Sequence, residues 1–185
     1  MIDSLCDQAE EKDMAVAWLY CDFLTHQELS ATAMLGAILR QLVNIGQMPE
    51  NIRKRFRKRF SGRGLRLPDM VGMLKTVISL LPQVYICIDA LDESTPESRQ
   101  ELLGSLQNIV RESPGTRVLF TGRSHVAEDV KKYFAEAIIL PVSPTKDDIR
   151  IYLDTRLDRD TEPHAMDNDL RWDIMRIISE TISEV

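Results

Sequence analysis

Five consecutive apolar residues, Val84-Tyr85-Ile86-Cys87-Ile88, constrain the fold of this chain more than any other segment. Successive side chains of a strand point to opposite faces, so a strand without polar alternation is buried on both faces. Strands of this kind occur in parallel sheets that helices cover on both sides. The segment therefore predicts an α/β fold built on a mostly parallel sheet.

The rest of the chain alternates strands with helices in the same way, which implies right-handed crossovers between parallel strands. Two helix starts carry clear signals, since Thr95-Pro96 reads as an N-cap followed by proline and Thr145 with Asp148 reads as a capping box. The other strands are expected at residues 14–23, 117–121 and 137–140. The helices are expected at residues 30–46, 68–82, 95–111, 126–134, 145–157 and 170–185, with the tail of another at residues 1–13.

The composition fits a globular protein in a reducing compartment. Hydrophobic residues make up 44% and charged residues 28%, which is ordinary for a chain with a core. No run of about 18 apolar residues occurs, so no membrane span is expected. The three cysteines are an odd number without clustered spacing, and no secretory signal opens the chain. These features predict a cytoplasmic location without a disulfide framework.

One basic segment, residues 53–66, departs from the net charge of −6. It could form a nucleic-acid patch, but only Phe56 and Phe60 accompany its lysines and arginines, and they sit four apart as on one helix face. We favour a solvated helix end and loop over nucleic-acid binding.

Three carboxylates, Asp89, Asp92 and Glu93, follow the buried strand directly. Ligands of open α/β sheets bind beyond the carboxyl ends of the strands, and Mg2+ binds there through one or two carboxylates plus phosphates. Arg123 follows the next strand and matches phosphate oxygens with its forked donors. The alternative is structural: Asp89 ends the turn while the other two favour the dipole of the next helix. An aspartate-nucleophile phosphatase would need a second aspartate at the position of Leu91.

The segment Ile88-Asp89-Ala90-Leu91-Asp92-Glu93 resembles the Walker B element of NACHT-type P-loop NTPases of the STAND class. The segments Trp18–Phe23 and Thr121-Gly122-Arg123 are similar to the corresponding strands of fungal, nephrocystin-like NACHT proteins, which often carry ankyrin repeats. The family more often has serine at the position of Gly122. The resemblance covers roughly residues 14–160.

The resemblance implies roles for four residues. Asp89 would hold Mg2+, Asp92 and Glu93 would position or activate the attacking water, and Arg123 would sense the terminal phosphate of ATP or GTP. It also implies an NTPase core over residues 1–160 and the start of a following helical region over residues 161–185.

The phosphate-binding loop that such a core requires is absent, because no G-x-x-x-x-G-K-[ST] occurs in the sequence. The resemblance implies the strand order 5-1-4-3-2, with strand 1 and its loop missing and Met1 inside the helix that follows that loop. Residues 14–121 should then form three adjacent strands, and residues 137–140 should be misplaced or pair directly with residues 117–121.

Two hypotheses for function follow. The chain is a fragment of a NACHT-like signalling NTPase, a nucleotide-dependent switch that oligomerises in the intact family, and is unable to bind nucleotide tightly or hydrolyse it alone. Alternatively it is a non-catalytic remnant that acts through other protein domains or self-association.

Overall fold

The computed structural model describes residues 14–21, 30–45, 66–159 and 167–181. Contacts divide the chain into two compact units, Met1–Ile139 and Leu140–Val185, and each is described by itself. The tail expected at residues 1–13 and the basic segment up to residue 65 lie outside the described residues.

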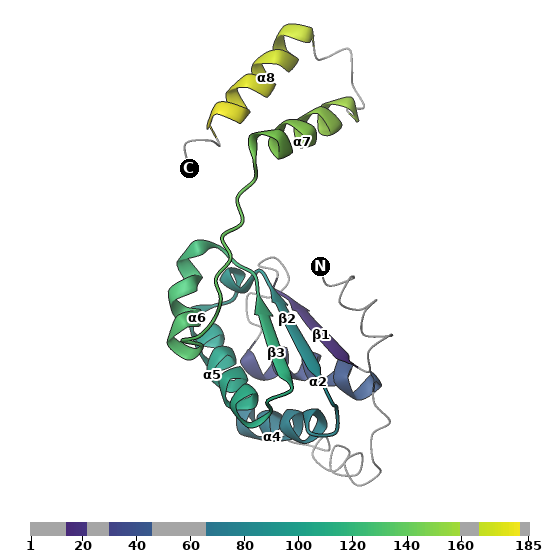
Figure 1. Cartoon of the computed structure of the whole chain (residues 1–185), viewed down its shortest axis with the longest axis vertical. Coiled ribbons are helices and arrows are strands. Elements are labelled where there is room, and N and C mark those ends of the chain that lie inside the picture. Colours follow the sequence, from purple (N-terminus) through teal and green to yellow (C-terminus); the bar gives the residue numbers. More distant parts are fainter. Residues whose placement is uncertain (1–13, 22–29, 46–65, 160–166, 182–185) are drawn as a thin grey trace. The chain divides into compact units, whose positions relative to one another are not determined.

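The first unit is built on a three-stranded parallel sheet with the order β1-β2-β3 (Figure 1). The strands are β1 (Ala15–Tyr20), β2 (Val84–Asp89) and β3 (Thr116–Phe120). The middle strand is the apolar segment on which the fold prediction rests: Val84 pairs with Ala15 on one side and Thr116 on the other. The prediction of three adjacent parallel strands within residues 14–121 is confirmed.

Three helices pack with the sheet around one core (Figure 1). They are α2 (Ala31–Ile45), α4 (Leu67–Ile78) and α5 (Pro96–Glu112). Their apolar residues recur every three or four positions, which gives each helix one apolar side. The largest fully buried side chains of this core are Leu35, Ile38, Leu42, Leu74, Ile86, Ile88, Leu91, Leu102, Leu103, Leu106, Ile109 and Val84.

The start of α5 follows its sequence signals. The Thr95 hydroxyl accepts a hydrogen bond from the Ser98 amide at 3.3 Å, and Pro96 occupies the first helical position. This cap satisfies one of the free amides that every helix start exposes. It fixes the start of α5 at Pro96, seven residues after the end of β2 at Asp89.

Gln41 of α2 covers the outer edge of β1. Its side-chain oxygen accepts a hydrogen bond from the Trp18 amide at 3.0 Å, and its side-chain nitrogen donates to the Trp18 carbonyl at 2.7 Å. A single side chain thus satisfies both backbone groups that Trp18 turns away from β2.

After β3 the chain forms a short 3₁₀ helix, η2 (Ser124–Val126), and then α6 (Ala127–Tyr133). The strand expected at residues 137–140 is not formed, so this prediction is wrong. The Ala137 amide instead bonds to the Phe134 carbonyl at 3.0 Å, which turns the chain at the end of α6. Apolar residues alone do not make a strand, since a strand needs a neighbour for its backbone groups.

The second unit contains α7 (Lys146–Asp158) and α8 (Asn168–Thr181). The predicted capping box is confirmed: the Asp148 amide bonds to the Thr145 hydroxyl and the Thr145 amide to the Asp148 carboxylate. Arg171 of α8 joins the two helices through ion pairs of 3.3 Å to Asp154 and 2.7 Å to Asp158.

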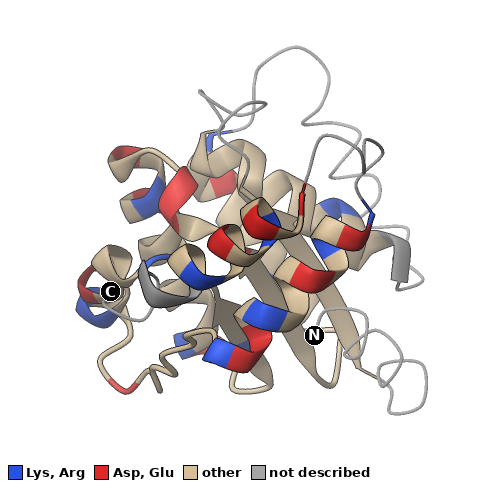
Figure 2. Ribbon diagram, turned by 90° about the horizontal axis from the view of Figure 1, so that it is seen from above, with Lys and Arg blue, Asp and Glu red and all other residues tan. Residues whose placement is uncertain are grey.

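Acidic and basic residues are interspersed along the described helices (Figure 2). Among the described residues, no helix combines the length and the apolar character needed to cross a membrane.

Candidate functional site

The segment Asp89–Glu93, here called the acidic turn, leaves the carboxyl end of β2 in a sharp bend. Ala90 has φ 54° and ψ 46°, the left-handed region that residues with a Cβ rarely adopt. The next residues form a 3₁₀ helix, η1 (Leu91–Glu93), whose first side chain is fully buried in the core. Burial of Leu91 therefore anchors the turn and directs its carboxylates to the sheet edge.

Thr121, directly after β3, holds the acidic turn through its hydroxyl and its backbone. Its hydroxyl donates a hydrogen bond to Oδ1 of Asp89 and accepts one from the Ala90 amide at 3.0 Å. Its carbonyl accepts from the Leu91 amide at 2.9 Å. These bonds satisfy the backbone where the ladder between β2 and β3 ends, and they stabilise the left-handed bend.

Asp92 contacts Arg123 with both carboxylate oxygens. Oδ1 accepts a hydrogen bond from the Arg123 amide at 3.2 Å, and Oδ2 lies 3.4 Å from Arg123 Nε. Gly122 allows this approach, because a Cβ there would lie 3.3 Å from Asp92 Oδ1 and 2.9 Å from Val126 Cγ2. The acidic turn and the arginine are therefore brought together, as their places after neighbouring strands predict.

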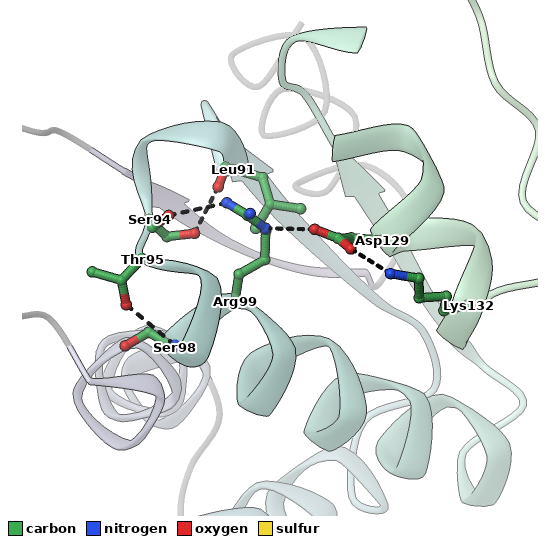
Figure 3. A network of polar contacts seen from close by, with 7 residues as sticks. All are labelled: Leu91, Ser94, Thr95, Ser98, Arg99, Asp129 and Lys132. Carbon is green, nitrogen blue, oxygen red and sulfur yellow. Dashed lines mark hydrogen bonds and ion pairs between the residues drawn. The ribbon is translucent and has the colours of Figure 1, made fainter. Parts of the chain in front are cut away.

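A buried arginine braces the far end of the acidic turn (Figure 3). Arg99 Nη1 donates to the Ser94 carbonyl at 3.0 Å, and Arg99 Nε donates to Asp129 Oδ2 of α6 at 3.2 Å. Lys132 bonds to the other oxygen of Asp129 at 2.9 Å and is the main cause of the lowered pKa of that carboxyl. The Ser94 hydroxyl closes the turn on the Leu91 carbonyl at 2.6 Å.

Cys21 brings the end of β1 to the same place. Its amide donates to the Asp89 carbonyl at 3.0 Å. Burial raises the pKa of the Cys21 thiol to about 11, and the negative charges of Glu93, Asp89 and Asp92 add to this shift. All three strand ends therefore meet at the acidic turn, where a thiol stays neutral at physiological pH.

The four predicted site residues thus lie within one region of the first unit. Sequence reasoning misses Thr121, Cys21 and Arg99 as parts of it. Thr121 and Cys21 had a signal, since each follows a predicted strand of the same sheet. Arg99 had none, because an arginine in the first turns of a helix is ordinary.

The carboxylates of the acidic turn offer one free ligand oxygen for a magnesium ion. Among the described residues, no group of three or more His, Cys, Asp or Glu side chains is placed to hold a metal. Asp89 Oδ1 is bonded to Thr121, and Oδ2 has no partner in the described part of the chain. One carboxylate oxygen suits Mg2+ that takes its other ligands from water and phosphate.

Comparison with one solved structure supports the fold. The chain is similar to the Orc1 protein of Aeropyrum pernix, solved in complex with DNA, with a TM-score of 0.54 and 19% sequence identity over 99% of this chain and 50% of that chain. It also resembles a Walker-type ATPase of Pyrococcus abyssi, with a TM-score of 0.43 and 12% identity over 85% of this chain and 56% of that one. The chain thus spans about half the length of each.

A comparison with curated proteins finds no match. The profile of the nephrocystin 3 N-terminal family, in contrast, matches residues 1–123, which include the whole three-stranded sheet and all four predicted site residues. Because this profile covers more than half of the chain, the chain belongs to the nephrocystin 3 N-terminal family.

Proposed function

We propose that the acidic turn is the Walker B element of a NACHT-type nucleotide switch of the STAND class, and that this chain carries half of a site for Mg2+ and ATP or GTP. One observation carries the proposal: Asp89 keeps one oxygen available at the end of β2 while Thr121 fixes the other, and Arg123 follows the neighbouring strand β3. A hard carboxylate oxygen next to an arginine fork matches a magnesium–phosphate group.

Each residue has a role in this proposal. Asp89 binds the ion directly or through water, Asp92 and Glu93 position or activate the attacking water, and Arg123 meets the terminal phosphate. Bound Mg2+ would neutralise phosphate charge. The NTPase core extends over residues 1–160 in this proposal, and the following helical region begins at residue 161.

The sequence holds no glycine-rich loop with Lys-Ser or Lys-Thr, so the backbone donors and the lysine that usually cradle phosphates are not supplied here. We therefore expect the chain by itself to bind Mg2+–ATP only weakly, with a Kd of roughly 1 mM or above. Tight binding and hydrolysis by this chain are not expected.

Titration of the isotope-labelled chain with Mg2+–ATP tests the proposal by NMR. Amide signals of Asp89–Glu93 and Thr121–Arg123 should shift, and Asp89→Asn should abolish the shifts. Glu101→Gln on the exposed side of α5 is the matched control and should leave them unchanged. Shifts that avoid both segments would refute the half-site, and micromolar affinity would refute the expected weakness.

A second candidate function is protein contact, through other domains or self-association in a cytoplasmic protein. Exposed apolar side chains in the second unit favour it: Ile151 and Tyr152 on α7, and Trp172 and Ile177 on α8. Single exposed apolar residues are ordinary, but four on two helices are unusual for a surface that stays in water. Light scattering over a concentration series tests self-association: Tyr152→Glu should reduce it, while a purely monomeric wild type would remove this candidate.

A further inference from the structure

The ion pair between Asp92 and Arg123 joins a buried carboxylate to a solvent-exposed guanidinium. The Asp92 side chain is only 9% exposed, whereas the Arg123 side chain is 80% exposed. Asp92 therefore lies within the protein, and the arginine reaches from it into solvent. The carboxylate is the fixed partner of the pair.

Asp92 uses both of its oxygens on one residue. Oδ1 accepts a hydrogen bond from the Arg123 amide, and Oδ2 forms an ion pair of 3.4 Å with Nε, the guanidinium nitrogen nearest the backbone. The absence of a side chain at Gly122 makes room for this contact, since a Cβ there would lie 3.3 Å from Asp92 Oδ1. An arginine whose backbone amide is bonded and whose Nε is paired has lost part of the freedom of its long side chain.

The two terminal nitrogens of Arg123 remain available. No partner of Nη1 or Nη2 occurs among the described residues. These nitrogens form the fork that binds an oxyanion with two parallel hydrogen bonds. Because the Arg123 side chain is already oriented, binding an oxyanion costs less side-chain entropy than it would for an unpaired arginine.

We propose that Asp92 is a positioning residue that orients Arg123 for a phosphate group. Asp92 then acts through Arg123 and touches neither water nor phosphate itself. This inference rests on the proposed function, since it assigns Arg123 the phosphate that the half-site takes. It changes the role of Asp92 from the activation of water to the alignment of a cation.

Alignment and simple electrostatics predict opposite changes in anion affinity when Asp92 is neutralised, and this difference tests the proposal. Asp92→Asn removes one negative charge from a site for an anion, so charge alone would strengthen anion binding. The asparagine amide, however, offers Nε of Arg123 no carboxylate oxygen and can present a nitrogen to it. Positioning therefore predicts weaker binding where charge alone predicts stronger binding. Glu97→Gln makes the same charge change on an exposed residue in the first turn of α5, outside the proposed site, and is the matched control.

The experiment measures binding of tripolyphosphate to the full chain by calorimetry and by NMR. Asp92→Asn should weaken binding about tenfold, the loss expected for one charge-assisted hydrogen bond. Arg123→Lys should weaken it at least as much, because lysine lacks both Nε and the fork. Glu97→Gln should bind as tightly as the wild type or more tightly. Unchanged or tighter binding by Asp92→Asn would overturn the proposal.

A second measurement needs no ligand and separates this proposal from the proposed function. The Arg123 Nε–H of the wild type should exchange slowly with solvent, and Asp92→Asn should speed that exchange. Absence of tripolyphosphate binding with a slow Nε–H would refute the proposed function but not the alignment, whereas a fast Nε–H in the wild type would refute the alignment. Should Asp92→Asn fail to fold, the wild type still decides: Nε–H must stay protected when tripolyphosphate binds, and loss of protection would mean that phosphate displaces Asp92.

Discussion

Replacement of Arg99 by methionine tests whether the brace between the acidic turn and α6 stabilises the fold. Methionine keeps the unbranched apolar stem and removes both donated hydrogen bonds. The bond to the Ser94 carbonyl lies in a buried environment, and a charged donor of this kind contributes about 1.5–3 kcal/mol. The pair with Asp129 lies nearer to solvent, where Lys132 already holds the other carboxylate oxygen, so it adds less. We expect Arg99→Met to lower the free energy of unfolding by about 2 kcal/mol.

Urea unfolding followed by tryptophan fluorescence measures this loss. A Trp172→Phe background leaves Trp18 of β1 as the only tryptophan, so the signal reports the first unit. Arg99→Lys is the control: its ammonium keeps the charge but can reach only one of the two acceptors, so about 1 kcal/mol should be lost. A change below about 0.5 kcal/mol for Arg99→Met, with an unchanged m-value, would show that the buried bond contributes nothing net.

Three further predictions address the strand ends, at Thr121, Gly122 and Cys21. Thr121→Val removes the hydroxyl at nearly constant volume and should lower the free energy of unfolding by about 1–3 kcal/mol, while Thr121→Ser should retain most of it in the same urea titration. The new Cβ of Gly122→Ala lies 2.9 Å from Val126 Cγ2. The double variant that adds Val126→Ala removes this contact, so it should have a higher apparent Tm than Gly122→Ala alone. With Cys21 as the only cysteine, alkylation should follow a thiol pKa of about 11, and Glu93→Gln should lower that pKa, as the rate against pH will measure. The raised pKa means that the neutral Cys21 thiol stabilises the folded state relative to the unfolded state. This contribution to the free energy of unfolding should be present below pH 9 and disappear as the pH rises towards 11. Cys21→Ala should not show this loss.

Much of the sheet could be predicted from the sequence because its strands carry strong local signals. The unbroken apolar run Val84–Ile88 identifies a strand buried on both faces, and its place at the centre of the sheet agrees. The caps at Thr95 and Thr145 are equally local, since each depends on residues within four positions. The proximity of Asp92 and Arg123 follows from parallel strands that end on one side.

The contacts that shape the site are long-range and were not predictable in this way. The bond from Thr121 to Asp89 joins residues that are 32 positions apart and depends on the register of β2 with β3. The bond from Arg99 to Asp129 joins residues 30 positions apart and depends on how α5 packs with α6. The failed strand at residues 137–140 has the same origin, because apolar composition does not reveal which backbone will lie beside it.

Gln41 makes the two edges of the sheet unequal as places where a further strand could pair. Its amide occupies the outward N–H and C=O of Trp18 as a neighbouring strand would, so a strand added beside β1 would have to displace Gln41. On β3 the outward backbone groups of Val118 and Phe120 have no partner in the described part of the chain. A strand that joins this sheet without displacing Gln41, from this chain or from another, joins at β3 and runs beside the residues that lead to Thr121 and Arg123. A strand added there would affect the acidic turn directly, because β3 is followed by Thr121, whose hydroxyl bonds to Asp89 and Ala90.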